Sequence, residues 1–252
     1  MDKNFNSLAV RLENKVYGSE KGIIRFQLLQ EDILDYYSNF KKGNLKILDA
    51  GGGSGRFSRF CALYKHNILL CDISEEMLSL AESENKKLNL GDKIRMKQID
   101  LTEISVETDG LFDMILLHGV AEWMDDPRAA IEHCCSLLKP GGCFSLLVYN
   151  THKYLLKRGY NGRLLTEDKI NEKRRKLTPT GRMTHEEITK VLEEYNGEVV
   201  LQSGIRIFNN FLKIIEPLPI SPEEWLEQER LYYRKQPYAS LGEHSHFLWI
   251  KK

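Results

Sequence analysis

The residues best suited to chemistry form a glycine-rich segment, DAGGGSGRF, at positions 49–57. An apolar run with the character of a β-strand leads into this segment, and a helical pattern follows it. Glycine lets a backbone turn tightly and approach a bound nucleotide-like ligand closely. A helix that begins just after such a turn points its free N–H groups at the ligand. The segment therefore predicts a cofactor site near the start of an α/β domain.

Two well-known glycine motifs do not fit this segment. A dinucleotide site expects G-x-G-x-x-G, but Ser58 or Arg56 stands where the third glycine should be, depending on the register. A phosphate-binding P-loop ends in Gly-Lys-Ser/Thr, which is also missing. The sequence therefore disfavours a nicotinamide-dependent oxidoreductase, which we keep as an alternative.

Acidic residues end the next two predicted strands. Asp72 lies seventeen residues after Gly55, close to where an acid accepts hydrogen bonds from ribose hydroxyls in nucleotide-binding folds. Asp72 could instead cap the following helix, although Ser74 is already available as a cap. Asp100 ends the third strand in an equivalent place, either beside an adenine or as a solvated loop acid.

Apolar strands alternate with helical patterns between residues 45 and 149. The predicted strands are 45–50, 67–71, 94–99, 112–117 and 143–149, and the predicted helices are 54–64, 74–88 and 127–138. Two further helices, 5–15 and 22–40, precede them. This alternation predicts a parallel sheet with helices on both faces and right-handed crossovers.

The pattern changes after residue 149. Residues 151–182 carry ten Lys or Arg against three acids and show few periodic apolar positions. A helix is then predicted at 185–195, strands at 198–208 and 244–250, and an acidic helix at 221–234 with Ser221 as its cap. The two late strands could pair as a hairpin with the acidic helix inserted between them.

We therefore expect a single domain over residues 1–252. Its parts are N-terminal helices (1–40), a cofactor-binding core (41–150), a basic insert (151–182) and C-terminal strands (183–252) that contain an acidic helical insert (216–240).

Composition favours a cytoplasmic protein. Lys plus Arg and Asp plus Glu both number 36, so no global field attracts nucleic acid, although a local basic face remains possible. The five cysteines show neither a C-x-x-C pair nor zinc-ligand spacing, and we expect buried, reduced thiols and no metal. The N-terminus lacks the apolar stretch of a signal peptide, and no apolar run approaches the ~20 residues that cross a bilayer.

Four segments resemble the class I S-adenosylmethionine-dependent methyltransferases: DAGGGSG, LLCDIS, FDMILLH and LKPGG. The resemblance runs from about residue 22 to residue 149. It implies a Rossmann-like, seven-stranded, mostly parallel sheet with the last strand antiparallel, a helical N-terminal extension and late inserts. It also implies a cofactor across the carboxyl ends of the strands. The glycine loop would then admit the amino-acid portion of S-adenosylmethionine, so a phosphate clamp is unnecessary.

Segments outside this core are similar to one family, the bacterial tRNA 5-carboxymethoxyuridine methyltransferases. These segments are NFNSLA, VYGSEKG, HGVAEWMDDPR, LVYN, GIRIFNNF and QPYASLG. The resemblance implies an enzyme that uses S-adenosylmethionine to esterify a carboxylate on the wobble uridine, with the tRNA anticodon stem-loop as partner. The cofactor-binding residues it implies are Arg25, Gly51, Gly52, Gly53, Asp72, Asp100, Leu101 and His118.

This reaction would demand little of the side chains. The carboxylate is ionised and the sulfonium is an activated methyl donor, so positioning, worth ~7–11 kcal/mol in well-oriented systems, replaces an acid–base pair. A cation should orient the substrate carboxylate, and Arg206 and Arg182 are the candidates for it. We rank Arg206 first, because it is a charged residue in an otherwise apolar strand pattern. Tyr149 and Tyr238 are candidate hydrogen-bond donors or stacking surfaces. Asn150 and Trp123 could line the same cavity, with core packing as the alternative for Trp123.

Basic residues of the insert are candidate tRNA contacts. The run Lys173, Arg174, Arg175 and Lys176, together with Arg182, could follow phosphates, and the alternative is a solvated charged loop. An unpaired anticodon base can splay out and stack on aromatic rings. Two further alternatives remain, a small-molecule carboxyl or O-methyltransferase with the late insert as a lid, and a non-catalytic S-adenosylmethionine-binding protein.

Overall fold

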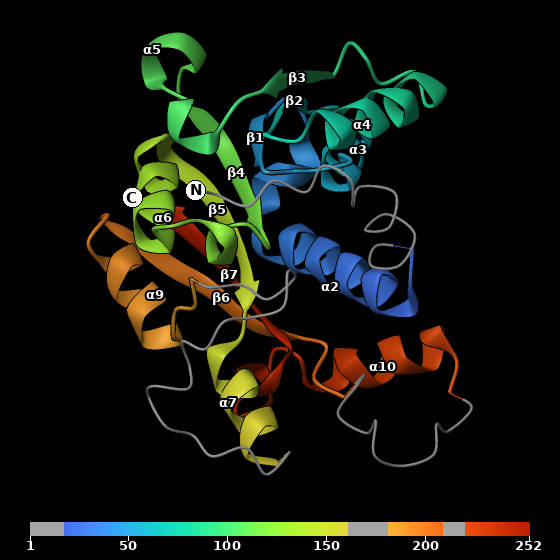
Figure 1. The fold of residues 1–252 in the computed structure, drawn as a ribbon, viewed down its shortest axis with the longest axis vertical. Helices are drawn as coiled ribbons and strands as arrows, with labels where there is room; N and C mark the ends of the chain where they lie inside the picture. Colours follow the sequence, from blue (N-terminus) through green and yellow to red (C-terminus); the bar gives the residue numbers. More distant parts are fainter. Residues whose placement is uncertain (1–17, 161–180, 209–219) are drawn as a thin grey trace.

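The protein is built around one seven-stranded sheet (Figure 1). The computed structural model describes residues 18–160, 181–208 and 220–252. The strands are β1 (Lys46–Ala50), β2 (Asn67–Asp72), β3 (Ile94–Gln98), β4 (Phe112–His118), β5 (Leu138–Tyr149), β6 (Gly197–Ile205) and β7 (His244–Lys251). Their spatial order is β3-β2-β1-β4-β5-β7-β6. Strands β1 to β5 pair in parallel, whereas β7 runs antiparallel to both of its neighbours. The predicted sheet, mostly parallel with an antiparallel last strand, is confirmed.

Helices cover both faces of the sheet (Figure 1). The α-helices are α2 (Glu20–Tyr36), α3 (Arg56–Leu63), α4 (Glu75–Lys87), α5 (Val106–Asp109), α6 (Pro127–Ser136), α7 (Thr151–Tyr160), α9 (His185–Glu193) and α10 (Pro222–Tyr232). Short 3-10 helices are η2 (Ser38–Lys42), η3 (Leu101–Glu103), η4 (Ala121–Trp123) and η5 (Tyr238–Leu241). Helices α2, α3 and α4 pack on one face, and α6 and α9 pack on the other.

The buried strands explain why the sheet has two covered faces. β4, and β5 from Gly142 onward, are mostly buried, as expected for strands packed on both sides. One apolar cluster joins the sheet to α6 and α9, and a second joins it to α2 and α3. All five cysteines lie buried as free thiols within these layers. In the described parts of the chain, no helix is long and apolar enough to cross a membrane.

Several helix starts follow the predicted capping residues. The Ser74 hydroxyl accepts a hydrogen bond from the Met77 N–H at the start of α4. Ser221 caps α10 in a reciprocal capping box with Glu224, and Pro222 occupies the first helical position. The strands β6 and β7 pair antiparallel with α10 between them in sequence, as predicted.

The boundaries differ from the predictions at several places, and four of the differences have a clear physical reason. The helix predicted at 22–40 ends at Tyr36, because Tyr37 leaves helical geometry, and η2 follows. The helix predicted from residue 54 begins at Arg56, since Gly55 is left-handed. β5 begins at Leu138 instead of Cys143, with an irregular pairing to β4 that takes up the KPGG turn.

The fourth difference is helix α7, which begins at Thr151 inside the predicted basic insert. The Asn150 side chain accepts a hydrogen bond from the Lys153 N–H and so caps the first turn of this helix. Sequence periodicity alone does not reveal such a cap. The helix predicted at 5–15 lies outside the described residues.

Candidate functional site

A cavity of about 410 Å³ opens at the carboxyl ends of the parallel strands. Its walls come from the loop after β1, the ends of β2 and β4, the loop after β3, and helix α2. The residues expected to bind a cofactor all line it: Arg25, Gly51, Gly52, Gly53, Asp72, Asp100, Leu101 and His118. The structure therefore brings together residues that lie as far as 93 positions apart in the chain. Trp123 also lines this cavity.

The glycine loop turns sharply between β1 and α3. Gly51 and Gly53 have φ of 63° and 55°, a left-handed conformation that side chains disfavour. The N–H groups of Gly51 and Gly52 both donate to the carbonyl of Cys71, which ties the loop to the end of β2. A Cβ added at Gly52 would lie 2.4 Å from Leu70 Cδ1. The loop is thus built for close approach to its surroundings.

Asp72 has a role in the protein itself, besides facing the cavity. Its Oδ2 accepts a hydrogen bond from the Gly53 N–H at 2.9 Å, and its Oδ1 accepts one from the Ser74 N–H at 2.8 Å. Burial raises its pKa above the ordinary value despite these hydrogen bonds. A carboxylate oxygen accepts more than one hydrogen bond, so Asp72 can orient the glycine loop and still accept from a ligand.

Two other acids stand at the cavity wall. Asp100 Oδ1 accepts hydrogen bonds from the N–H and the hydroxyl of Thr102 and so starts η3. Asp49, buried below the glycine loop, accepts a hydrogen bond from the Ser58 hydroxyl at 2.6 Å. Desolvation raises the pKa of Asp49 to about 6. The burial of Asp49 was not predicted from the sequence.

His118, at the end of β4, is held by one ring nitrogen only. Its Nε2 lies 2.7 Å from Ser145 Oγ, whereas Nδ1 is buried and has no hydrogen-bond partner in the described part of the protein. The Phe57 ring packs edge-on against it, with 4.6 Å between ring centroids. Burial, with His246 and Arg25 nearby, lowers the pKa of His118 well below its ordinary value. The ring is therefore a neutral imidazole at pH 7.

His244 is a second cavity histidine that sequence analysis missed. It begins β7, lines the cavity, and packs on the Tyr149 ring with 4.5 Å between ring centroids. Its Nδ1 is also buried without a partner among the residues described. Burial, followed by the nearby cations Arg25 and Arg206, lowers the pKa of His244 well below its ordinary value. Only the insertion of β7 beside β5 brings His244 here, and no local sequence signal indicates that pairing.

The four candidate positioning residues occupy different places. Tyr149 lines the cavity, and Arg182 lies over the Tyr154 ring at 3.9 Å and over the Tyr149 ring at 5.9 Å. Arg206 is buried behind the cavity wall in a left-handed conformation, with φ of 64°. Its Nε has no hydrogen-bond partner within the described chain, and burial lowers its pKa. Tyr238 lies outside the cavity lining and packs on Tyr232.

Asn150 does not line the cavity, contrary to expectation. Its amide donates hydrogen bonds to the carbonyls of Ser240 and Gly242, both at 2.9 Å, while its oxygen caps α7. All of these contacts are structural. Glu122, which sequence analysis did not single out, instead lies buried under Tyr149 and accepts a hydrogen bond from its N–H at 3.3 Å. Desolvation raises the pKa of Glu122 to about 7.

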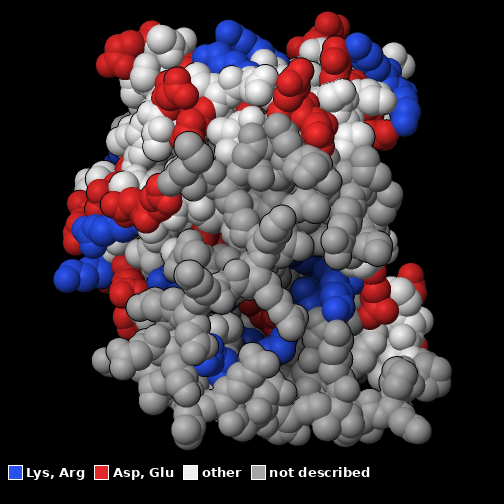
Figure 2. All heavy atoms as spheres, in the orientation of Figure 1, with Lys and Arg blue, Asp and Glu red and all other residues white. Residues whose placement is uncertain are grey.

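The predicted basic contacts are only partly described. The run of residues 173–176 lies outside the described residues, and Arg182 is placed as above. Lys153 is buried, donates to the Ile207 carbonyl, and has its pKa lowered to about 8 by burial. Figure 2, in the orientation of Figure 1, shows Lys and Arg interspersed with Asp and Glu over the described surface of the face in view. No group of three or more metal-ligating side chains is found among the described residues.

Comparisons with known proteins agree on one family of folds. Residues 48–146 match a family model described as a methyltransferase domain. The tRNA 5-carboxymethoxyuridine methyltransferase of Escherichia coli (strain K12) is 29% identical over 247 residues, 97% of this chain and 95% of that protein. The ubiquinone biosynthesis O-methyltransferase of Colwellia psychrerythraea (strain 34H) is 29% identical over 185 residues, 70% of each chain.

A solved structure shows the same architecture. The magnesium protoporphyrin IX methyltransferase from Synechocystis PCC 6803, with bound SAH, is similar with a TM-score of 0.67 and 16% identity. The match covers 98% of this chain and 96% of that chain. The two proteins therefore share the same overall fold.

Proposed function

This chain is a class I, S-adenosylmethionine-dependent methyltransferase, and from that premise we propose that it methylates the carboxylate of 5-carboxymethoxyuridine at the wobble position of tRNA. The observation that carries the choice of substrate is the length of the similarity. The match to the tRNA methyltransferase extends over 97% of this chain, well beyond residues 48–146 of the shared domain.

In this proposal S-adenosylmethionine occupies the cavity. Asp72 accepts hydrogen bonds from the ribose, and Asp100 and Leu101 border the adenine. Arg25 forks onto the carboxylate of the amino-acid portion, which lies against the glycine loop. The buried, unpartnered Nδ1 atoms of His118 and His244 are consistent with a polar ligand there, because such atoms are costly when left unpaired.

The substrate side of the cavity is formed by groups that orient an anion. Tyr149 lines the cavity, and the Arg206 guanidinium lies behind it with an unpartnered Nε. Arg206 is buried, its Nε has no hydrogen-bond partner among the described residues, and Glu243 and Glu229 are the carboxylates whose charges act on it. A buried cation of this kind favours an anionic ligand, here the substrate carboxylate.

The reaction then needs positioning and no proton transfer. The bound cofactor supplies a methyl group that is activated by its sulfonium. One carboxylate oxygen forms the new O–C bond while the S–C bond breaks, so the two opposite charges are neutralised together. His118 is neutral, and the reaction needs no base. Both points agree with a site that only orients and desolvates the reactants.

A small-molecule O-methyltransferase is the second candidate. It is supported by the similarity to the ubiquinone biosynthesis enzyme, which covers 70% of this chain. This match is shorter than that to the tRNA enzyme. It predicts turnover of a metabolite and no dependence on tRNA.

The deciding experiment measures nucleosides by mass spectrometry in cells that lack this protein. We expect the wobble methyl ester to be absent, to return with the wild-type protein, and to form in vitro when the purified protein, S-adenosylmethionine and tRNA from the deficient cells are mixed. If purified tRNA gains no methyl ester in the presence of protein that binds the cofactor, the tRNA assignment is wrong.

Two sets of variants test the substrate side. Arg206→Gln should lower kcat/KM for tRNA roughly 10- to 100-fold while leaving S-adenosylhomocysteine affinity unchanged. Arg128→Gln, which removes an exposed cation that pairs with Glu194, is the matched control and should change neither. Charge reversal at Lys173 to Lys176 should raise KM for tRNA, and an unchanged KM would exclude this run as a phosphate contact.

A further inference from the structure

His118 is the first member of a chain of buried side chains that leads away from the cavity. Its Nε2 lies 2.7 Å from Ser145 Oγ on β5, and this oxygen lies 2.8 Å from His246 Nε2 on β7. His246 Nδ1 lies 2.7 Å from Asp32 Oδ2 on α2. Ser145, His246 and Asp32 are completely buried. The chain thus connects the cavity wall to a helix on one face of the sheet.

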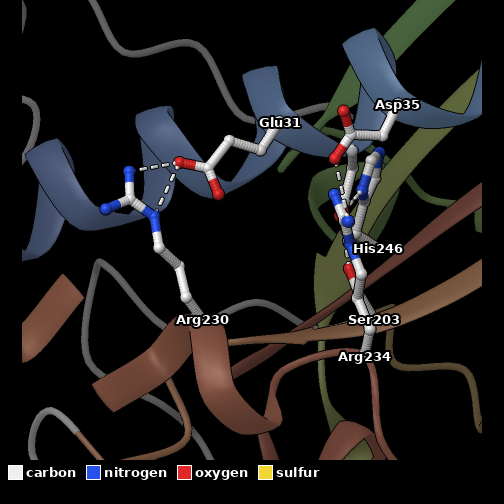
Figure 3. A network of polar contacts seen from close by, with 7 residues as sticks. Glu31, Asp35, Ser203, Arg230, Arg234 and His246 are labelled. Atoms are coloured by element: carbon white, nitrogen blue, oxygen red, sulfur yellow. Dashed lines mark hydrogen bonds and ion pairs between the residues drawn. The ribbon is translucent and has the colours of Figure 1, made fainter. Parts of the chain in front are cut away.

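Asp32 is surrounded by donors at the far end of this chain. Its Oδ2 also accepts a hydrogen bond from the Ser203 hydroxyl, and its Oδ1 accepts one from Arg234 Nε at 2.8 Å. Arg234 donates as well to Asp35, which fixes its guanidinium between two carboxylates of α2. Figure 3 shows these groups meeting where α2 faces the segment after α10. These three hydrogen bonds, one of them from the Arg234 guanidinium, suit a carboxylate that only accepts.

An acceptor at Asp32 determines the direction of every hydrogen bond in the chain. His246 must donate to Asp32 from Nδ1. A neutral His246 carries its single proton on that nitrogen, so its Nε2 is an acceptor. Ser145 therefore donates its single hydroxyl proton to His246. The Ser145 oxygen is then free to accept only from His118, whose proton must be on Nε2.

We propose that Asp32, acting through His246 and Ser145, holds His118 in the Nε2–H tautomer, which leaves the buried Nδ1 of this cavity residue as a hydrogen-bond acceptor. Asp32, His246 and Ser145 are positioning residues, because none of them lines the cavity. A ligand group that reaches this buried nitrogen would have to donate a hydrogen bond to it. S-adenosylmethionine and S-adenosylhomocysteine carry such a group in the ammonium of their amino-acid portion. This consequence rests on the cofactor placement given under the proposed function.

Asp32→Asn tests the proposal with almost no change in shape. The amide oxygen would accept from Arg234, as Oδ1 does now, and the NH2 group would face His246 and Ser203. His246 Nδ1 would become an acceptor, and the donor direction would reverse at His246, at Ser145 and at His118. Nδ1 of His118 would change from acceptor to donor, without any substitution in the cavity.

The measurement is the tautomeric state of both histidines by ¹⁵N NMR of the full-length, ligand-free protein. In the wild type we expect His118 to carry its proton on Nε2 and His246 on Nδ1. In Asp32→Asn we expect both protons on the opposite nitrogens, and roughly 10- to 100-fold weaker binding of S-adenosylhomocysteine by calorimetry. Glu31→Gln is the matched control, because it breaks the neighbouring contact to Arg230 on the same interface and should change neither result.

The wild-type spectrum alone can overturn the proposal. A proton on Nδ1 of His118, or on Nε2 of His246, would contradict the derived direction even if Asp32→Asn fails to fold. An unchanged His118 tautomer in a folded Asp32→Asn protein would do the same. These readouts need neither tRNA nor methyl transfer, so they remain informative if the proposed substrate is wrong, and loss of tRNA methylation would not affect them.

Discussion

Replacing Asp72 by alanine separates its two roles at the cavity. The carboxylate accepts from the Gly53 and Ser74 N–H groups in the protein and is placed to accept from the ribose of the cofactor. Charge-assisted hydrogen bonds are worth ~1.5–3 kcal/mol, which corresponds to a loss of roughly 10- to 150-fold in affinity. We expect this loss for S-adenosylhomocysteine in calorimetry, together with lower stability in urea, because two backbone donors lose their partner.

Ser74→Ala is the control that isolates the ribose contact. It removes the cap of α4 and should cost about 1 kcal/mol of stability, but it leaves the Asp72 carboxylate in place. Its affinity for S-adenosylhomocysteine should remain at the wild-type value. Equal affinities for Asp72→Ala and Ser74→Ala would refute the reasoning and leave Asp72 with the structural role alone.

Three other predictions concern pH, packing and thiols. The pKa of Glu122 rises from 4.5 to about 7 on folding, so the folded protein holds a proton between these values and loses stability as the pH rises through them. Glu122→Gln should therefore gain up to roughly 3 kcal/mol relative to wild type between pH 5 and pH 8, and a pH-independent difference in urea unfolding would contradict this. Gly242→Ala should lower the Tm, costing ~1–3 kcal/mol, since its Cβ would lie 2.5 Å from the Gly204 backbone, whereas Gly159→Ala enters open space and should not. Burial raises the pKa of Cys71 to about 12, so this thiol should resist alkylation until urea unfolds the chain, and rapid labelling of folded protein would refute its burial.

The sequence could predict those parts of the site that directly follow a strand in the chain. The glycine loop and Asp72 follow their own strands directly, and parallel strands bring their carboxyl ends to one edge. The order of the alternating elements was sufficient to place them together. The fold of the core could be predicted for the same reason.

The missed parts depend on contacts between distant segments. His244 reaches the cavity through the pairing of β5 with β7, which links residues about a hundred positions apart. Glu122 is buried and accepts a hydrogen bond from the Tyr149 N–H, and its neighbours in sequence do not indicate that burial. Asn150 was misassigned because its polar side chain satisfies backbone groups of residues 240 and 242. Polar residues with such partners look the same in sequence as polar residues that face a ligand.

The position of β7 has a consequence for the order of events during synthesis. β7 lies between β5 and β6 although the ribosome makes it after both. Until then β6 has no strand neighbour within the described sheet, and its open edge can pair with other chains. Pairings between residues so far apart along the chain form slowly. Since β7 brings His244 into the cavity lining, a nascent chain acquires a complete cavity wall only when this late strand has inserted.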